Sequence, residues 1–231
     1  MNQKRVAILQ SSYIPWKGYF DMMRQVDEFI LYDDVQFTRR DWRSRNKIKT
    51  PTGLKWLSIP VKQRENHQSE AEAQLICEVE IADPSWVDKH WNAIKLSYSK
   101  APFWSDFSES VRQMYEAVSS EKMLSQINYT FLVSISQILK INTEITWSMG
   151  YHAQGRKTDR LIDILVKTGA THYLSGPAAK SYIEDQKFAD ANIQLGWMSY
   201  HYPEYPQLYP PFEHGVSVLD MIFNVGASFL D

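Results

Sequence analysis

The sequence predicts an α/β protein whose mainly parallel sheet has a Rossmann-like layered arrangement. The first observation is an apolar run at 6–10, followed by a helix-like segment at 19–26 and a second apolar run, 28–34, that ends in two carboxylates. A strand–helix–strand unit of this kind favours parallel strands joined by a right-handed crossover. The second observation is that strand-like and helix-like segments alternate again after residue 143, so we expect both ends of the chain to supply strands to one sheet.

The second α/β unit is predicted from apolar runs that are separated by glycine and polar turns. Gly169 is expected to end its helix, because a glycine just past a helical period is typical of a C-terminal cap. The predicted elements are a strand at 144–148, a helix at 157–168, a strand at 171–174, a strand within 193–200 and a terminal helix at 216–223.

A helical insertion is expected between the two units, at about 85–141. Asp83 and Pro84 form an N-terminal helix signal, and Pro102 divides the first two of three predicted helices. Alternating apolar residues before the insertion predict strands at 55–61 and 75–81. A length of 231 residues suits one large domain, so we expect a single α/β domain over 1–231.

Composition excludes several classes of protein. Lys and Arg number 25 and Asp and Glu number 27, and this net charge of −2 argues against a general nucleic-acid binder. The one cysteine, Cys77, excludes an intrachain disulfide and suits a reducing compartment. About 18 consecutive apolar residues occur nowhere, so no membrane span is expected. We expect a cytoplasmic protein that binds a small molecule, partly through its 13% aromatic residues.

The loop after the first strand is the first candidate binding segment. In open parallel sheets, ligands bind beyond the carboxyl ends of the strands, where this loop would lie. Gln10, Tyr13 and Trp16 together offer polar and stacking contacts there. The alternative interpretation is a rigid packed corner at Pro15 and Trp16, and the loop has no glycine-rich phosphate motif.

Asp33 and Asp34 end the second predicted strand and are the leading acid–base candidates. A carboxylate at that position suits a general base or a ligand of Mg²⁺ beside a phosphate. Because alternate residues of a strand point to opposite faces, only one of the two is expected to act. The alternative is a carboxylate that stabilises a turn.

The segment 39–49 is the strongest electrostatic feature, with six cations and one acid. Arg45, Asn46 and Lys47 are its predicted phosphate-binding members, and Trp42 is suited to stacking on a base or sugar ring. A solvated basic face is the alternative. A nucleic-acid site would look similar, but the slightly acidic chain favours a nucleotide-linked metabolite.

Three further substrate-binding candidates, Tyr173, Ser175 and Gly176, lie at the end of the strand predicted at 171–174. A Ser-Gly pair is also a common turn. His201 flanks a loop rich in tyrosine and proline and is a candidate general base. The six histidines lack the spacing of a zinc site, so no metal site is expected, and the sequence names no cofactor.

Several segments read together resemble the WbqC-like family. The N-terminal segments are Gln-Ser-Ser-Tyr-Ile-Pro-Trp-Lys-Gly-Tyr-Phe at 10–20, Asp-Asp-Val-Gln-Phe at 33–37 and Arg-Asn-Lys-Ile-Lys at 45–49. Tyr-Leu-Ser-Gly at 173–176, Tyr-Pro-Gln at 205–207 and Ser-Val-Leu-Asp-Met-Ile-Phe-Asn at 217–224 extend the resemblance over nearly the whole chain. The resemblance implies a place among bacterial surface-polysaccharide and O-antigen genes, and it implies no established catalytic residue.

Together, the residues and the resemblance predict a transferase of polysaccharide precursor biosynthesis that modifies a nucleotide-linked sugar. Acyl or aminoacyl transfer to an amino sugar is the specific expectation. Two alternatives stay open: ATP- and Mg²⁺-dependent nucleotidyl or adenylyl transfer, and a non-catalytic binding protein of the same pathway. The expected partner is a phosphate-bearing small molecule, not nucleic acid, and a homo-oligomer is left open.

Overall fold

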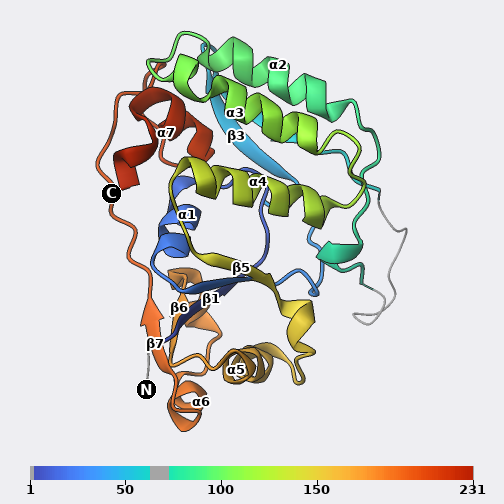
Figure 1. Ribbon diagram of the computed structural model, residues 1–231, viewed down its shortest axis with the longest axis vertical. Coiled ribbons are helices and arrows are strands. Elements are labelled where there is room, and N and C mark those ends of the chain that lie inside the picture. Colours follow the sequence, from blue (N-terminus) through green and yellow to red (C-terminus); the bar gives the residue numbers. More distant parts are fainter. Residues whose placement is uncertain (1–2, 63–72, 231) are drawn as a thin grey trace. The chain divides into compact units, whose positions relative to one another are not determined.

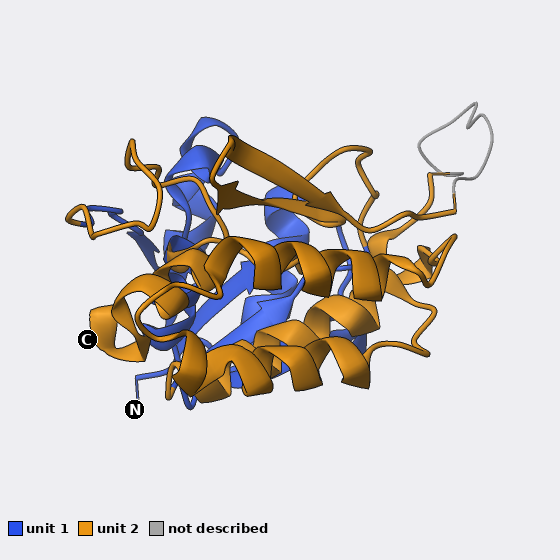
Figure 2. Ribbon diagram, turned by 90° about the horizontal axis from the view of Figure 1, so that it is seen from above, with its two compact units in different colours: residues 1–10, 18–34, 141–202 blue, residues 11–17, 35–140, 203–231 orange. Residues whose placement is uncertain are grey.

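The computed structural model describes residues 3–62 and 73–230, which form an α/β protein with a five-stranded parallel sheet and a small antiparallel sheet (Figure 1). The chain divides into two compact units, coloured separately in Figure 2. Unit 1 contains residues 1–10, 18–34 and 141–202, and unit 2 contains 11–17, 35–140 and 203–231. The single domain expected from the sequence stays a prediction.

The parallel sheet belongs to unit 1, and its strands lie in the order β5-β2-β1-β6-β7. Numbered by their occurrence in the chain, these strands run 3-2-1-4-5, which is the order of a Rossmann-like sheet. The expected Rossmann-like parallel sheet is therefore confirmed. The strands are β1 (Arg5–Leu9), β2 (Glu28–Leu31), β5 (Glu144–Trp147), β6 (His172–Ser175) and β7 (Gln194–Trp197).

Helices of unit 1 pack on both faces of this sheet because its buried strands are apolar on both sides. Val6, Ile8 and Ile30 share a core cluster with Leu161, Ile164 and Leu165 of α5 (Lys157–Thr168) and with Phe188 of α6 (Asp185–Asp190). On the opposite face of the sheet, the Phe29 ring packs against the Tyr19 ring of α1 (Lys17–Arg24), with 5.1 Å between the ring centroids. Gly169 caps α5 at a φ of +70°, as the sequence predicts.

Unit 2 contains the predicted helical insertion, which is confirmed as three helices. They are α2 (Trp86–Tyr98), α3 (Trp104–Ala117) and α4 (Leu124–Ile138), and the terminal helix α7 (Val218–Val225) belongs to the same unit. The ring of Phe223 stacks on Tyr98 and packs against Trp104, with centroid distances of 5.3 and 5.0 Å. These contacts join α7 to α2 and α3.

An antiparallel hairpin completes the regular structure of unit 2. Strand β3 (Arg45–Thr50) pairs with β4 (Gly53–Ser58), in a register that sets Lys47 opposite Trp56 and Arg45 opposite Ser58. One face of the hairpin is buried through Asn46, Ile48 and Leu57. The opposite side of β3 carries Arg45, Lys47 and Lys49 of the basic segment.

The prediction of a strand at 75–81 is wrong. The structure has a 3₁₀ helix there, Ile76–Glu78, flanked by isolated bridges at Leu75 and Ile81. Ile76 and Val79 are both fully buried, and a three-residue spacing places both in the core through a single helical turn. None of the described helices is long and apolar enough to cross a membrane.

Candidate functional site

The carboxyl edge of the parallel sheet in unit 1 gathers many of the predicted site residues. Strands β1 and β6 are neighbours, so the strand order reverses between them, and such a switch point is where open α/β sheets bind ligands. Strand order within unit 1 thus brings together sequence positions more than 160 residues apart. The predicted residues at this edge are Gln10 after β1, Asp33 and Asp34 after β2, and Ser175 and Gly176 at the end of β6.

At the switch point itself, Gly176 lies beside a tyrosine that the sequence analysis did not single out. A Cβ atom added at Gly176 would lie 3.9 Å from the Tyr200 hydroxyl and 3.7 Å from Met22. Both distances are ordinary van der Waals contacts, so these two side chains are the neighbours of Gly176. Burial raises the pKa of Tyr200 to about 12, so its phenol stays protonated and able to donate. Gln10 is anchored through its carbonyl, which accepts a 3.0 Å hydrogen bond from the Tyr19 hydroxyl.

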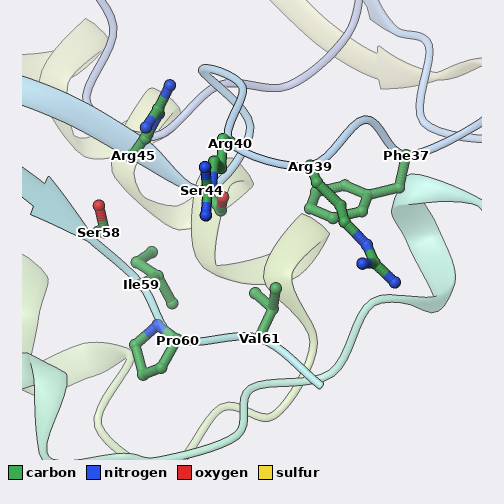
Figure 3. Close-up of a pocket in the computed structure, with 9 residues that line it drawn as sticks. All are labelled: Phe37, Arg39, Arg40, Ser44, Arg45, Ser58, Ile59, Pro60 and Val61. Carbon is green, nitrogen blue, oxygen red and sulfur yellow. The ribbon is translucent and has the colours of Figure 1, made fainter. Parts of the chain in front are cut away.

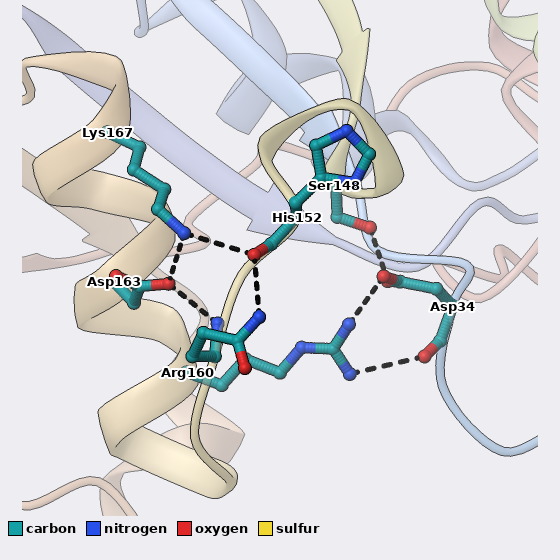
Figure 4. A network of polar contacts seen from close by, with 7 residues as sticks. Asp34, Ser148, His152, Arg160, Asp163 and Lys167 are labelled. Atoms are coloured by element: carbon teal, nitrogen blue, oxygen red, sulfur yellow. Dashed lines mark hydrogen bonds and ion pairs between the residues drawn. The ribbon is translucent and has the colours of Figure 1, made fainter.

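Asp34 is held in a polar network at the same edge (Figure 4). Its carboxylate accepts a hydrogen bond from the Ser148 hydroxyl at 2.5 Å and forms an ion pair with Arg160 of α5. Arg160 also donates to the Asp34 carbonyl at 3.3 Å. The Asp34 carboxylate is therefore held by two partners, one on the 3₁₀ turn after β5 and one on α5. Asp33 is fully buried.

Two of the predicted aromatic contacts are core residues. The Tyr173 ring stacks on Phe188 with planes 5° apart, and only 3% of the residue is exposed. The Tyr13 hydroxyl lies 2.8 Å from His90 Nδ1 and 2.5 Å from the Tyr115 hydroxyl, inside unit 2. Tyr13 in the loop after the first strand and Tyr173 within a strand were both predicted to contact substrate, but in each case the side chain packs in a core.

The loop 11–17 of unit 2 has a strained backbone that Asn46 holds in place. Ile14 has a φ of +36°, which is rare for a β-branched residue. The Asn46 side-chain amide donates to the carbonyls of Tyr13 and Ile14 at 3.2 and 2.9 Å, and Asn46 is 2% exposed. Asn46 therefore fixes this loop. Trp16 is half-buried, and its ring lies 5.9 Å from the Lys17 ammonium.

A pocket of about 620 Å³ in unit 2 is lined by three arginines of the predicted basic segment (Figure 3). In that view, Arg45 and Ser58 of the hairpin stand opposite Phe37 and Arg39. No carboxylate is among its lining residues, so the pocket is electropositive and suits an anion. Its lining consists of Phe37, Arg39, Arg40, Ser44, Arg45, Ser58, Ile59, Pro60 and Val61.

Arg45 also contacts an aromatic ring. Its guanidinium carbon lies 4.2 Å from the centroid of Trp56, and Lys47 Nζ lies 5.1 Å from the same centroid. The Arg45 Nε is buried and has no hydrogen-bond partner among the described residues. The sequence singled out Arg45 and Lys47 but not Trp56, although its alternation with Leu54 and Ser58 on one strand face was readable.

A second charged cluster of unit 2, the Asp220 network, is buried. The Asp220 carboxylate accepts hydrogen bonds from Tyr98 and Tyr205 at 2.9 Å and from Gln207 at 2.7 Å. Gln207 in turn accepts a 2.9 Å bond from the Lys49 ammonium. Burial raises the pKa of Asp220 and lowers that of Lys49, while their opposite charges counteract both shifts. Sequence reasoning missed this network because its members are far apart in the chain.

His201 is exposed, and its Nδ1 lies 2.9 Å from the Ser199 hydroxyl, just beyond β7. Among the residues that the structure describes, no group of three or more His, Cys, Asp or Glu side chains is arranged to hold a metal ion.

Comparisons with known proteins identify a family and a relative of this chain. Residues 10–231 match the model of the WbqC-like protein family. The chain is also 41% identical over 229 residues to the uncharacterized protein Rv1507c of Mycobacterium tuberculosis (strain ATCC 25618 / H37Rv). That alignment covers 99% of this chain and 96% of the relative. No solved structure matches.

Proposed function

Because the chain belongs to the WbqC-like family, we propose that it is a cytoplasmic transferase that modifies a nucleotide-linked sugar in bacterial surface-polysaccharide precursor biosynthesis. The observation that supports this proposal most is the arginine-lined pocket of unit 2. Its volume of about 620 Å³ is in the range of small-molecule sites, and three guanidinium groups suit the phosphates of a nucleoside diphosphate.

In this proposal, Arg39, Arg40 and Arg45 neutralise the phosphates, and Ser44 and Ser58 add hydroxyl groups at the pocket wall. The transferred group would be acyl or aminoacyl and its acceptor an amino sugar. The acid–base candidates stay Asp33, Asp34 and His201. Of these, His201 is exposed, while Asp34 is already paired with Arg160.

The test is a ligand screen by thermal stabilisation. Nucleotide-linked amino sugars should raise the melting temperature, since a ligand at 100 times its dissociation constant stabilises by about 2.7 kcal/mol. Arg40→Ala should weaken this stabilisation, and Arg112→Ala, which removes an exposed arginine of α3, should not. Stabilisation by ATP with Mg²⁺ alone would favour nucleotidyl transfer. Equal behaviour of Arg40→Ala and the parent toward every ligand would refute the proposal.

A further inference from the structure

Two large aromatic rings are exposed on the outer face of the hairpin in unit 2. Trp42 is 43% exposed and Trp56 is 41% exposed, and their ring centroids are 5.5 Å apart. Leu54, on the same face of β4, is 43% exposed. Burying such rings is strongly favourable, so a contiguous exposed group of them indicates a surface that a ligand covers.

The hairpin register sets two cations against these rings. Lys47 is directly opposite Trp56, and Arg45 is the diagonal neighbour on the same face, so both side chains reach the indole. Lys47 Nζ lies 6.0 Å from the Trp42 centroid as well. Both side chains contact these rings, and among the described residues neither Arg45 nor Lys47 forms an ion pair with a carboxylate. The surface therefore combines flat apolar faces with uncompensated positive charge.

This surface is continuous with the arginine-lined pocket. Arg45 lines the pocket and packs on Trp56, and Ser58, its partner across the ladder, lines the pocket too. A ligand with phosphates against Arg45 therefore has its next group beside the two indoles. A nucleotide has that composition, because a planar base and its phosphates are joined through one ribose.

We infer that Trp42 and Trp56 form a stacking platform for the base of a nucleotide whose phosphates occupy the arginine-lined pocket. The inference rests on the proposed function and deepens it, because it makes the base, rather than the phosphates alone, a determinant of binding. Single-stranded nucleic acid is bound by the same stacking and cation contacts. A formal net charge of −2 disfavours that extended polyanion and favours one nucleoside diphosphate.

The experiment measures the affinities of UDP, GDP, CDP, dTDP and inorganic diphosphate by calorimetry, with the parent, Trp56→Leu and Trp56→Phe. Stacking on an aromatic side chain accounts for about 10-fold to 100-fold in affinity per base. Trp56→Leu should weaken the preferred nucleoside diphosphate by that factor and leave inorganic diphosphate unchanged. Trp56→Phe should restore most of the loss, because it keeps a flat ring.

Trp42→Leu provides a second variant in case Trp56→Leu does not fold, and Tyr182→Leu removes an exposed ring of unit 1 as a control. Equal losses for UDP and inorganic diphosphate in Trp56→Leu, or no loss for either, would overturn the platform. If Arg40→Ala weakens every ligand while the tryptophan variants weaken none, the proposed function stands without the platform. If the parent binds no nucleoside diphosphate, both fail, and tighter binding of an oligonucleotide overturns the choice of a single nucleotide.

Discussion

The two charged clusters of unit 2 differ in how their charges are compensated. In the Asp220 network, the carboxylate has three hydrogen-bond donors, and the Lys49 ammonium donates to Gln207 and to the Pro211 carbonyl. In the arginine-lined pocket, three guanidinium groups meet no lining carboxylate. A buried charge without partners costs several kcal/mol, so compensation is required in the first cluster, whereas solvent can screen charges in the second.

This difference separates residues that hold the fold from residues available to a ligand. The members of the Asp220 network come from the hairpin, α2, the segment after residue 203 and α7, and their bonds tie these elements together. The arginine-lined pocket, in contrast, has no carboxylate among its lining residues. Substitutions in the two clusters should therefore affect different quantities: the free energy of unfolding in one and ligand affinity in the other.

Asp220→Ala should have the largest effect on stability. It leaves the hydroxyls of Tyr98 and Tyr205 without their acceptor and Lys49 without the nearby opposite charge. A buried donor left without its acceptor costs about 1–3 kcal/mol, and two hydroxyls lose theirs here, so the loss should reach several kcal/mol. Chemical denaturation should show this loss, whereas the exposed Asp88→Ala on α2 should stay within about 0.5 kcal/mol of the parent. Similar denaturation midpoints for both variants would contradict the comparison.

The second prediction concerns pH and His90, a buried group of unit 2 that is held neutral. Burial is the main cause that lowers the pKa of His90 from 6.5 to about 4. Between these values the unfolded chain binds a proton that the folded chain does not, so stability falls as pH decreases from 6.5 to 4. A difference of about 2.5 pKa units corresponds to about 3 kcal/mol. Denaturation at several pH values should show this slope, and His90→Gln should flatten it; an unchanged slope in that variant would refute the assignment.

The sheet was predictable from sequence, and the reason is local. Val6–Leu9 and the run ending at Leu31 are continuous apolar segments separated by one helix, and such units leave few topologies open. The prediction of a strand at 75–81 was wrong because alternation of apolar residues over a short run does not distinguish a strand from a single 3₁₀ turn that buries Ile76 and Val79. Pro84 and Gly169 were useful signals of helix ends because both act on the backbone directly. Proline restricts φ, whereas glycine permits a positive φ.

Asp34→Ala, at the sheet edge of unit 1, should have an intermediate effect. It removes the acceptor of Ser148 and the partner of Arg160, and hydrogen bonds to charged groups contribute about 2 kcal/mol. A double-mutant cycle with Arg160→Ala should give a coupling energy above 0.5 kcal/mol, since the two side chains are in contact. Glu144→Ala, an exposed strand-end carboxylate, is the control. Zero coupling would show that the pair does not stabilise the folded state.

Site residues were harder to predict than the sheet, because side-chain direction depends on tertiary packing. The sequence placed Tyr173 at the end of a strand, and the alternation of side chains along that strand directs its ring to Phe188 in the core. Asn46 was predicted to bind phosphate, but its amide hydrogen-bonds a strained loop about 32 residues earlier. Trp56 gave no motif of its own, and only the pairing of β3 with β4 brings it to Arg45 and Lys47.

The smallest effect on stability is expected for Arg40→Ala and Lys47→Ala, and this prediction tests the comparison most directly. Neither side chain makes a hydrogen bond or ion pair within the described residues, and like charges near one another repel. Arg40 has a φ of +56°, and alanine keeps the same Cβ, so the substitution does not change the backbone strain. The free energy of unfolding should therefore change by less than about 0.5 kcal/mol.

Stabilisation by inorganic diphosphate should decrease in both variants, and its dependence on salt should flatten, because fewer exposed charges remain to be screened. A loss of stability as large as that of Asp220→Ala, with diphosphate binding unchanged, would mean that these cations hold the fold and that the distinction between the two clusters is wrong.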